Sequence, residues 1–169
     1  MNSRGQGDEV FRVLIEVIMG ALILAIILGA VDYFSGLRVD ASEQRLHGAF
    51  ANAFEKLNSD LTSQTAIEEK DLLLNQTTYG SRGFAIGYDI QPECINFYHS
   101  SSKAFNQLSD VHVIEITQTV QTSVYMQCFT QQAANQLTSE IVPLGGNTQC
   151  PVYCAISFGK KLPILPPTN

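Results

Sequence analysis

The 169-residue sequence predicts an α+β fold in which a long N-terminal helix packs on a small antiparallel β-sheet. Three observations support this prediction. Residues 17–31 are apolar and uncharged, residues 39–57 repeat apolar side chains with a helical period, and residues 111–129 are rich in valine, isoleucine and threonine. A chain of this length holds one modest domain besides such a helix.

The first half of the predicted helix is long and apolar enough to cross a membrane. Residues 10–31 are interrupted only by Arg12 and Glu16, and a helix of this length measures about 33 Å, against a hydrocarbon layer of about 30 Å. Because a charge at the bilayer centre is costly, we expect Arg12 and Glu16 to pair near one interface. A removable secretory signal is the alternative, but no small-residue cleavage site follows. Membrane lipid is therefore an expected partner.

The second half of the predicted helix is amphipathic. Apolar residues recur at Val39, Leu46, Phe50, Ala53 and Leu57, and most charged residues of the segment fall on other faces. This stripe predicts that the second half of the helix packs on the sheet. The whole predicted helix covers residues 6–57.

A short motif precedes the apolar segment. Residues 3–6 read Ser-Arg-Gly-Gln, and two acidic residues follow before the apolar run. This start resembles the class III signal peptide of archaeal type IV pilins and pilin-like proteins, in which a prepilin peptidase cuts after a basic-Gly pair and leaves the apolar helix on the mature protein. The resemblance implies a leader of residues 1–5, cleavage between Gly5 and Gln6, and a pilin-like fold. It also implies prepilin peptidase and identical or related subunits of a helical filament as partners.

Two acidic residues at the edge of the apolar helix suggest a role in assembly. We expect that Glu9 or Glu16 meets the N-terminal amine of a neighbouring subunit, because an acid within a membrane segment is usually functional. The alternative is interfacial pairing with Arg12, and the sequence leaves both open.

Four cysteines follow the apolar segment: Cys94, Cys128, Cys150 and Cys154. An even number in a small domain predicts two disulfide bonds formed in an oxidising compartment, with buried free thiols as the alternative. Four cysteines allow three pairings, and the sequence does not choose among them. Arginines before the apolar segment and cysteines after it predict a cytoplasmic N-terminus and an extracellular head, on a single-pass membrane protein or on an assembled filament.

The remaining chain is divided into three parts. Residues 58–83 are polar and irregular, which predicts a connecting loop with at most one short strand. This segment contains the sequon at Asn75, which is a candidate glycan acceptor. Residues 84–161 predict a β-rich head with strands at 84–88, 94–98 and 152–158, two strands or a bulge within 111–129, and a turn at 143–147. Residues 162–169 form a proline-rich tail.

The sequence offers no set of catalytic residues. His47, His99 and His112 are scattered, and the spacing of Cys150 and Cys154 is not that of zinc ligands. No phosphate-binding or dinucleotide-binding motif occurs. We therefore expect a protein that is not an enzyme and that binds no metal or cofactor.

The net charge and the order of the predicted segments limit the kinds of partner and function that this protein could have. The net charge is −6 and no run of basic residues occurs, which argues against nucleic acid as a partner. Two functions stay open: a structural subunit of a surface filament used in adhesion or surface attachment, or a non-polymerising, membrane-anchored binding module or accessory subunit of a membrane complex.

Overall fold

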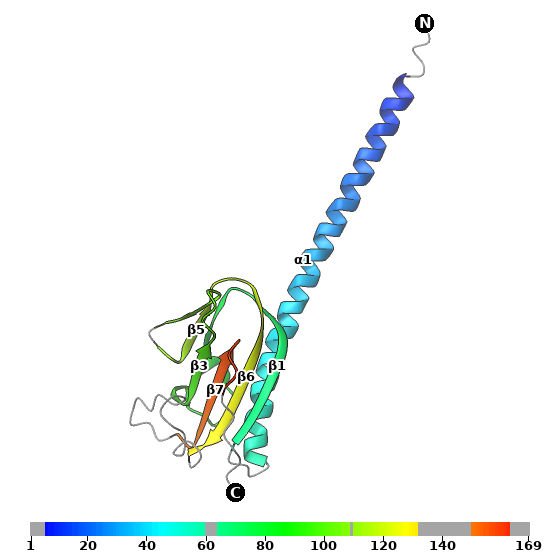
Figure 1. Ribbon diagram of the computed structural model, residues 1–169. Helices are drawn as coiled ribbons and strands as arrows, with labels where there is room; N and C mark the ends of the chain where they lie inside the picture. Colours follow the sequence, from blue (N-terminus) through cyan, green and yellow to red (C-terminus); the bar gives the residue numbers. More distant parts are fainter. Residues whose placement is uncertain (1–5, 60–63, 109, 132–149, 163–169) are drawn as a thin grey trace. The chain divides into compact units, whose positions relative to one another are not determined.

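The computed structural model describes residues 6–59, 64–108, 110–131 and 150–162. The chain divides into two compact units, Met1–Arg38 and Val39–Asn169. Helix α1 (Gln6–Ser59) is continuous through the boundary, and all the described strands belong to the second unit (Figure 1). The predicted α+β class is confirmed. The predicted leader, the turn at 143–147 and the tail beyond Leu162 lie outside the described residues.

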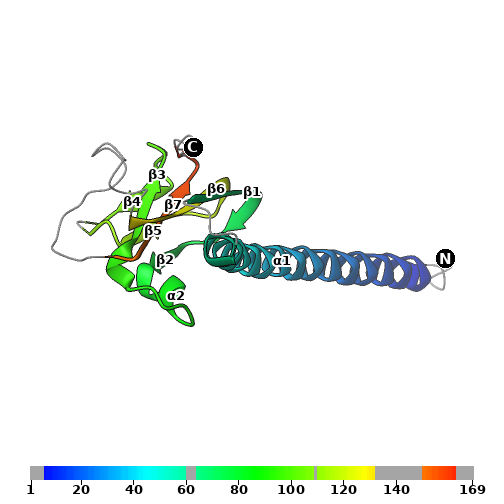
Figure 2. The ribbon, with the colours of Figure 1, turned by 90° about the horizontal axis from the view of Figure 1, so that it is seen from below.

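The larger sheet has four strands in the order β1-β6-β7-β3, which follow one another across the sheet in Figure 2. They are β1 (Gln64–Leu74), β6 (Val120–Thr130), β7 (Val152–Phe158) and β3 (Ile95–His99). The β1–β6 and β6–β7 pairs are antiparallel, as predicted, whereas β3 and β7 are parallel. The long connection between β3 and β7 allows this parallel pairing, since parallel strands need a crossover and cannot be joined by a tight turn.

A smaller sheet of three antiparallel strands was not predicted. Its order is β2-β5-β4, from β2 (Thr77–Gly80), β5 (Val113–Ile116) and β4 (Phe105–Gln107). The predicted division of 111–129 into two strands is confirmed by β5 and β6. The strand predicted at 84–88 is wrong, because Phe84 and Ala85 end the short helix α2 (Ser81–Ala85) and Gly87 turns the chain with a φ of 90°. The 3-10 helix η1 (Pro92–Cys94) precedes β3.

The connecting loop predicted at 58–83 is also wrong over most of its length. The segment contains β1, β2 and the start of α2. Strand β1 lies at the edge of its sheet, and its exposed positions carry polar residues such as Glu68 and Lys70. Asp71, with a φ of 56°, lies in an irregularity between Glu69 and Leu72 that shifts the register. These features hide the alternation by which a strand is usually recognised.

The predicted apolar stripe of α1 enters the core of the second unit. Leu46, Phe50, Ala53 and Leu57 are buried, whereas Val39 is only partly buried. The ring of Phe50 packs edge-on against Phe84 and Tyr88, with ring centroids 5.4 and 5.5 Å apart. Aromatic contacts of this kind add to the free energy of apolar burial. The core therefore joins the second half of α1 to α2 and the segment that follows it.

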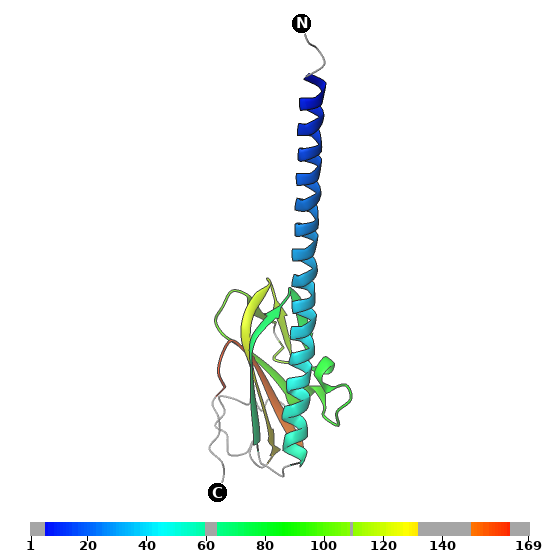
Figure 3. The same ribbon diagram turned by 90° about the vertical axis from the view of Figure 1, so that its right-hand side faces the viewer.

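Polar contacts fix the second half of α1 along β1, where the two elements lie side by side (Figure 3). The Arg45 guanidinium donates to the Glu69 carboxylate at 2.7 Å and to the Lys70 carbonyl at 3.0 Å. The Ser42 hydroxyl accepts a hydrogen bond from the backbone N–H of Leu73 at 2.9 Å. These bonds occupy backbone groups next to the irregularity in β1, so they fix the helix to the edge strand.

Candidate functional site

The first unit exposes an apolar segment, Val10–Leu37 of α1. Eighteen large apolar side chains in this segment are exposed, with Val10 at 70% and Ile26 at 71% of their full surface. The helix is long and apolar enough to cross a membrane, by length and composition. An exposed apolar surface of this extent is unusual in a soluble monomer, and the segment could anchor the chain in a membrane.

The predicted pairing of Arg12 with Glu16 is confirmed. The Arg12 Nε atom lies 3.3 Å from a Glu16 carboxylate oxygen, one helical turn away, and both side chains are largely exposed. Gly5 lies outside the described residues, and Gln6 is the first residue of α1. Glu9 lies on the same helix, but its side chain is also outside the described part. The predicted assembly role of Glu9 or Glu16 remains a prediction.

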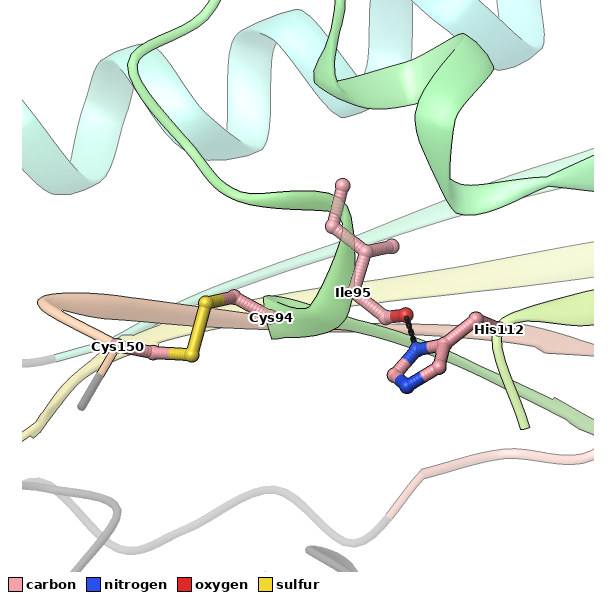
Figure 4. Close-up of a disulfide and its surroundings, with 4 residues drawn as sticks. All are labelled: Cys94, Ile95, His112 and Cys150. Atoms are coloured by element: carbon pink, nitrogen blue, oxygen red, sulfur yellow. Dashed lines mark hydrogen bonds between the residues drawn. A yellow bond between two sulfur atoms is a disulfide. The ribbon is translucent and has the colours of Figure 1, made fainter. Parts of the chain in front are cut away.

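The two disulfide bonds predicted for the second unit are present, and the structure selects one of the three pairings. Cys94 bonds to Cys150, joining η1 to the residue preceding β7 by two positions, and Cys128 bonds to Cys154 between β6 and β7. Cys128 and Cys154 are direct partners in the register of β6 and β7. Figure 4 shows the Cys94–Cys150 bond beside the start of β3. All four cysteines are paired.

Each histidine is held by a local contact. The ring of His47 stacks on Phe84 with centroids 4.7 Å apart. The Nδ1 atom of His99 lies 2.6 Å from the Ser100 carbonyl, and that of His112 lies 2.9 Å from the Ile95 carbonyl. Among the described residues, no group of three or more His, Cys, Asp or Glu side chains is placed to hold a metal ion.

The sequon residue Asn75 is exposed at the turn between β1 and β2. Its side-chain oxygen accepts hydrogen bonds from the Gln76 backbone N–H at 2.9 Å and from the Thr119 hydroxyl at 2.7 Å. These bonds occupy the oxygen and leave the amide nitrogen, which is the atom that a glycan would modify, without a bond in the described residues. The position is compatible with the predicted acceptor role.

Two tyrosines have a strongly raised pKa. Burial, together with the nearby Glu43 carboxylate, raises the pKa of Tyr79 to about 12. Burial also raises the pKa of Tyr98 to about 12, although a hydrogen bond with Asn96 acts in the opposite direction. Both groups are therefore held in the neutral form in the folded head.

We expect the head to lose stability at alkaline pH because of these tyrosines. A phenol of pKa near 10 in the unfolded chain and about 12 in the fold contributes stability below pH 10 that is lost as the pH rises from about 10 to 12. At pH 11 each tyrosine should account for a loss of about 1 kcal/mol. Urea unfolding at pH 8, 10 and 11 measures this loss, and Tyr79→Phe should reduce it. An equal loss in Tyr79→Phe and in the unsubstituted protein would contradict the assignment to Tyr79.

The chain matches no protein-family model, no curated protein and no solved structure. Besides the predicted residues, the structure groups Ser81, Asp110 and His112 around one surface cavity. The sequence could not reveal this group, because the pairing of β2 with β5 brings the three residues together.

Proposed function

We propose that this protein is a pilin-like structural subunit of a surface filament used in adhesion or surface attachment. The observation that supports it most is the exposed apolar segment Val10–Leu37, attached in sequence to a head with two disulfide bonds. A filament core of packed helices would bury this segment, and the membrane would hold it before assembly. The disulfide bonds favour a head in an oxidising compartment, outside the cell.

The leader motif at residues 3–6 supports the same proposal. Its resemblance to the class III signal peptide of archaeal type IV pilins implies cutting by a prepilin peptidase between Gly5 and Gln6. The exposed apolar segment begins at Val10, so a cut between Gly5 and Gln6 would leave it intact. Identical or related subunits would then be the main partners of the mature chain.

The Arg12–Glu16 ion pair favours a second function, that of a membrane anchor that does not polymerise. The pair lies within the apolar segment, and charged groups are costly in a dry helical core. A non-polymerising membrane anchor would place this pair at the lipid–water interface, where it costs less. The protein would then be an anchored binding module or an accessory subunit of a membrane complex.

Recovery of the protein from sheared cell surfaces separates the two functions. In the host, we expect the sheared fraction to contain the chain without residues 1–5 and with no alkylated cysteine. The measurement is the intact mass after thiol alkylation under non-reducing conditions.

The same mass tests for a glycan at Asn75, since extra mass that disappears in Asn75→Gln would identify a glycan at that residue. We expect Glu9→Gln to abolish recovery in the sheared fraction, because it removes the charge proposed to meet the amine of the next subunit.

Asp32→Asn is the matched control, since it also removes one acid from α1, and it should leave recovery unchanged. Equal membrane levels of both variants exclude a loss of expression. An uncut chain that begins at Met1 and stays in the membrane would reject the filament and favour the anchored module. If Glu9→Gln is recovered in the sheared fraction as well as the unsubstituted protein, the proposed role of Glu9 is rejected. That result would leave the proposal of a filament subunit standing.

A further inference from the structure

The aromatic residues of the first unit lie only at the two ends of its apolar segment. They are Phe11, Tyr33 and Phe34, and residues 12–32 between them contain no aromatic side chain. All three are exposed, at 61%, 65% and 63% of their full surface. A long aliphatic stretch of α1 therefore has exposed aromatic rings at each end.

The spacing of these rings along α1 fits a lipid bilayer. Phe11 and Tyr33 are 22 positions apart, which corresponds to about 33 Å along a helix. The hydrocarbon layer of a bilayer is about 30 Å thick. Side chains at this spacing can lie at both membrane–water interfaces at once. Tyrosine is enriched there, because its ring is apolar and its hydroxyl reaches water.

Charged residues lie next to the aromatic residues at both ends. Arg12 follows Phe11, and Asp32 precedes Tyr33. The stretch between Glu16 and Asp32 contains no charge and spans only about 24 Å. Helical side chains tilt toward the N-terminus, and the Glu16 carboxylate reaches back to within 3.3 Å of the Arg12 Nε atom. The pair can therefore carry both charges toward the N-terminal interface.

Exposed apolar side chains surround this part of α1 on every side. They occupy three consecutive positions in each of four successive runs, which are residues 13–15, 17–19, 22–24 and 26–28. A helix that packs on one partner needs a single apolar stripe, whereas a helix that is apolar all round fits a surrounding apolar medium such as lipid. The second half of α1 shows the contrast, since only its Leu46–Leu57 stripe is buried in the core.

We propose that α1 spans a lipid bilayer with Tyr33 at one membrane–water interface and the Arg12–Glu16 pair near the other, so that these side chains fix its depth. Leu22 then lies at the centre of the bilayer. The inference deepens the proposed function, because it names the lipid contacts that hold the chain before assembly, and it rests on the membrane stage of that function. A non-polymerising anchor would make the same contacts.

The first test uses tryptophan as a depth probe, because the chain contains none. The full-length variants Phe11→Trp, Leu22→Trp and Tyr33→Trp are each reconstituted in vesicles of dioleoylphosphatidylcholine. A small fraction of the lipid carries a nitroxide quencher, either near the headgroup or near the end of the acyl chain. We expect the deep quencher to act most on Leu22→Trp and the shallow quencher most on the other two. Tryptophan itself favours the interface, so deep quenching of Leu22→Trp is the more demanding result.

The second test removes the proposed anchor. Tyr33→Leu, made together with Leu22→Trp, keeps an apolar side chain and removes the hydroxyl. The helix should then shift along the bilayer normal, and the ratio of deep to shallow quenching should fall. Ile27→Leu in the same background is the matched control, since it changes an exposed apolar side chain within the span, and it should leave the ratio unchanged. Thiol alkylation checks that the two disulfide bonds of the head are intact.

Several outcomes would overturn the inference. If no variant is quenched, α1 does not enter the bilayer. Deep quenching of Phe11→Trp or Tyr33→Trp, or an unchanged ratio in Tyr33→Leu, would show that these ends do not lie at the interfaces. Recovery from sheared cell surfaces uses none of these measurements. A chain that inserts as expected but is absent from the sheared fraction would therefore reject the filament and keep the bilayer contacts.

Discussion

Replacing Cys94 and Cys150 together by alanine should lower the free energy of unfolding of the head by about 4 kcal/mol. The bond joins residues 56 positions apart, so its removal restores a large loop entropy to the unfolded chain. The loss is a large share of the stability expected for a small domain. Urea unfolding of the full chain in non-ionic micelles, followed by the circular dichroism of the strands, measures it.

The second disulfide bond provides the control for this result. Cys128 and Cys154 are 26 positions apart, so the corresponding double alanine variant should lose about 0.7 kcal/mol less. A loss below about 1 kcal/mol for the Cys94–Cys150 variant would contradict a stabilising role for that bond. Loss of the ordered head in both variants even without urea would mean that the apolar core alone cannot hold the fold.

Phe50→Ala should destabilise the head by about 3–5 kcal/mol, the usual cost of removing a buried phenylalanine. Only 1% of the Phe50 side chain is exposed, and its ring contacts α2 and the segment after it as well as its own helix. The substitution should leave a cavity, because the neighbouring rings of Phe84 and Tyr88 are themselves held by other contacts. The same urea experiment, with micelles present throughout, measures the effect.

Phe34→Ala is the matched control. It removes the same side chain from the same helix, but Phe34 is 63% exposed and belongs to the first unit. We expect its effect on unfolding of the head to stay within about 0.5 kcal/mol. Equal losses from the two substitutions would show that the second half of α1 is not part of the core of the head.

The helix could be predicted from the sequence because its signals are local. The apolar run before Asp32 and the stripe from Leu46 to Leu57 each lie within a single element, and both were correct. Strand β7 was equally clear, since Val152, Cys154, Ile156 and Phe158 alternate in the sequence, although the interior position of the strand also buries the residues between the last three. In these segments, the periodicity of the apolar residues within a single helix or strand is enough to identify the element.

The failures have a different physical origin. Strand β1 is an edge strand whose exposed positions and bulge at Asp71 remove the alternation, so only its pairing with β6 identifies it. The run at 84–88 is apolar enough for a strand, but packing of Phe84 and Tyr88 against α1 favours a short helix and a turn. Tertiary contacts override local preference in both cases.

The pairing of the cysteines and the surface cavity lined by Ser81, Asp110 and His112 could not be read from the sequence either. Each depends on which strands are neighbours, and the order of strands in the sheet is not the order in the chain. Ser81 and His112 are far apart in sequence and meet only because β2 pairs with β5.

The strand order also sets when the head can be completed during synthesis. Strand β7 follows every other described strand in sequence, yet it lies in the interior of the four-stranded sheet, between β6 and β3. Until β7 has left the ribosome, β3 has no neighbour in that sheet and both disulfide bonds lack a cysteine, since Cys150 and Cys154 belong to this last segment. The head therefore stays unfinished for most of translation, and folding depends on contacts that are distant in the chain, which makes it slow.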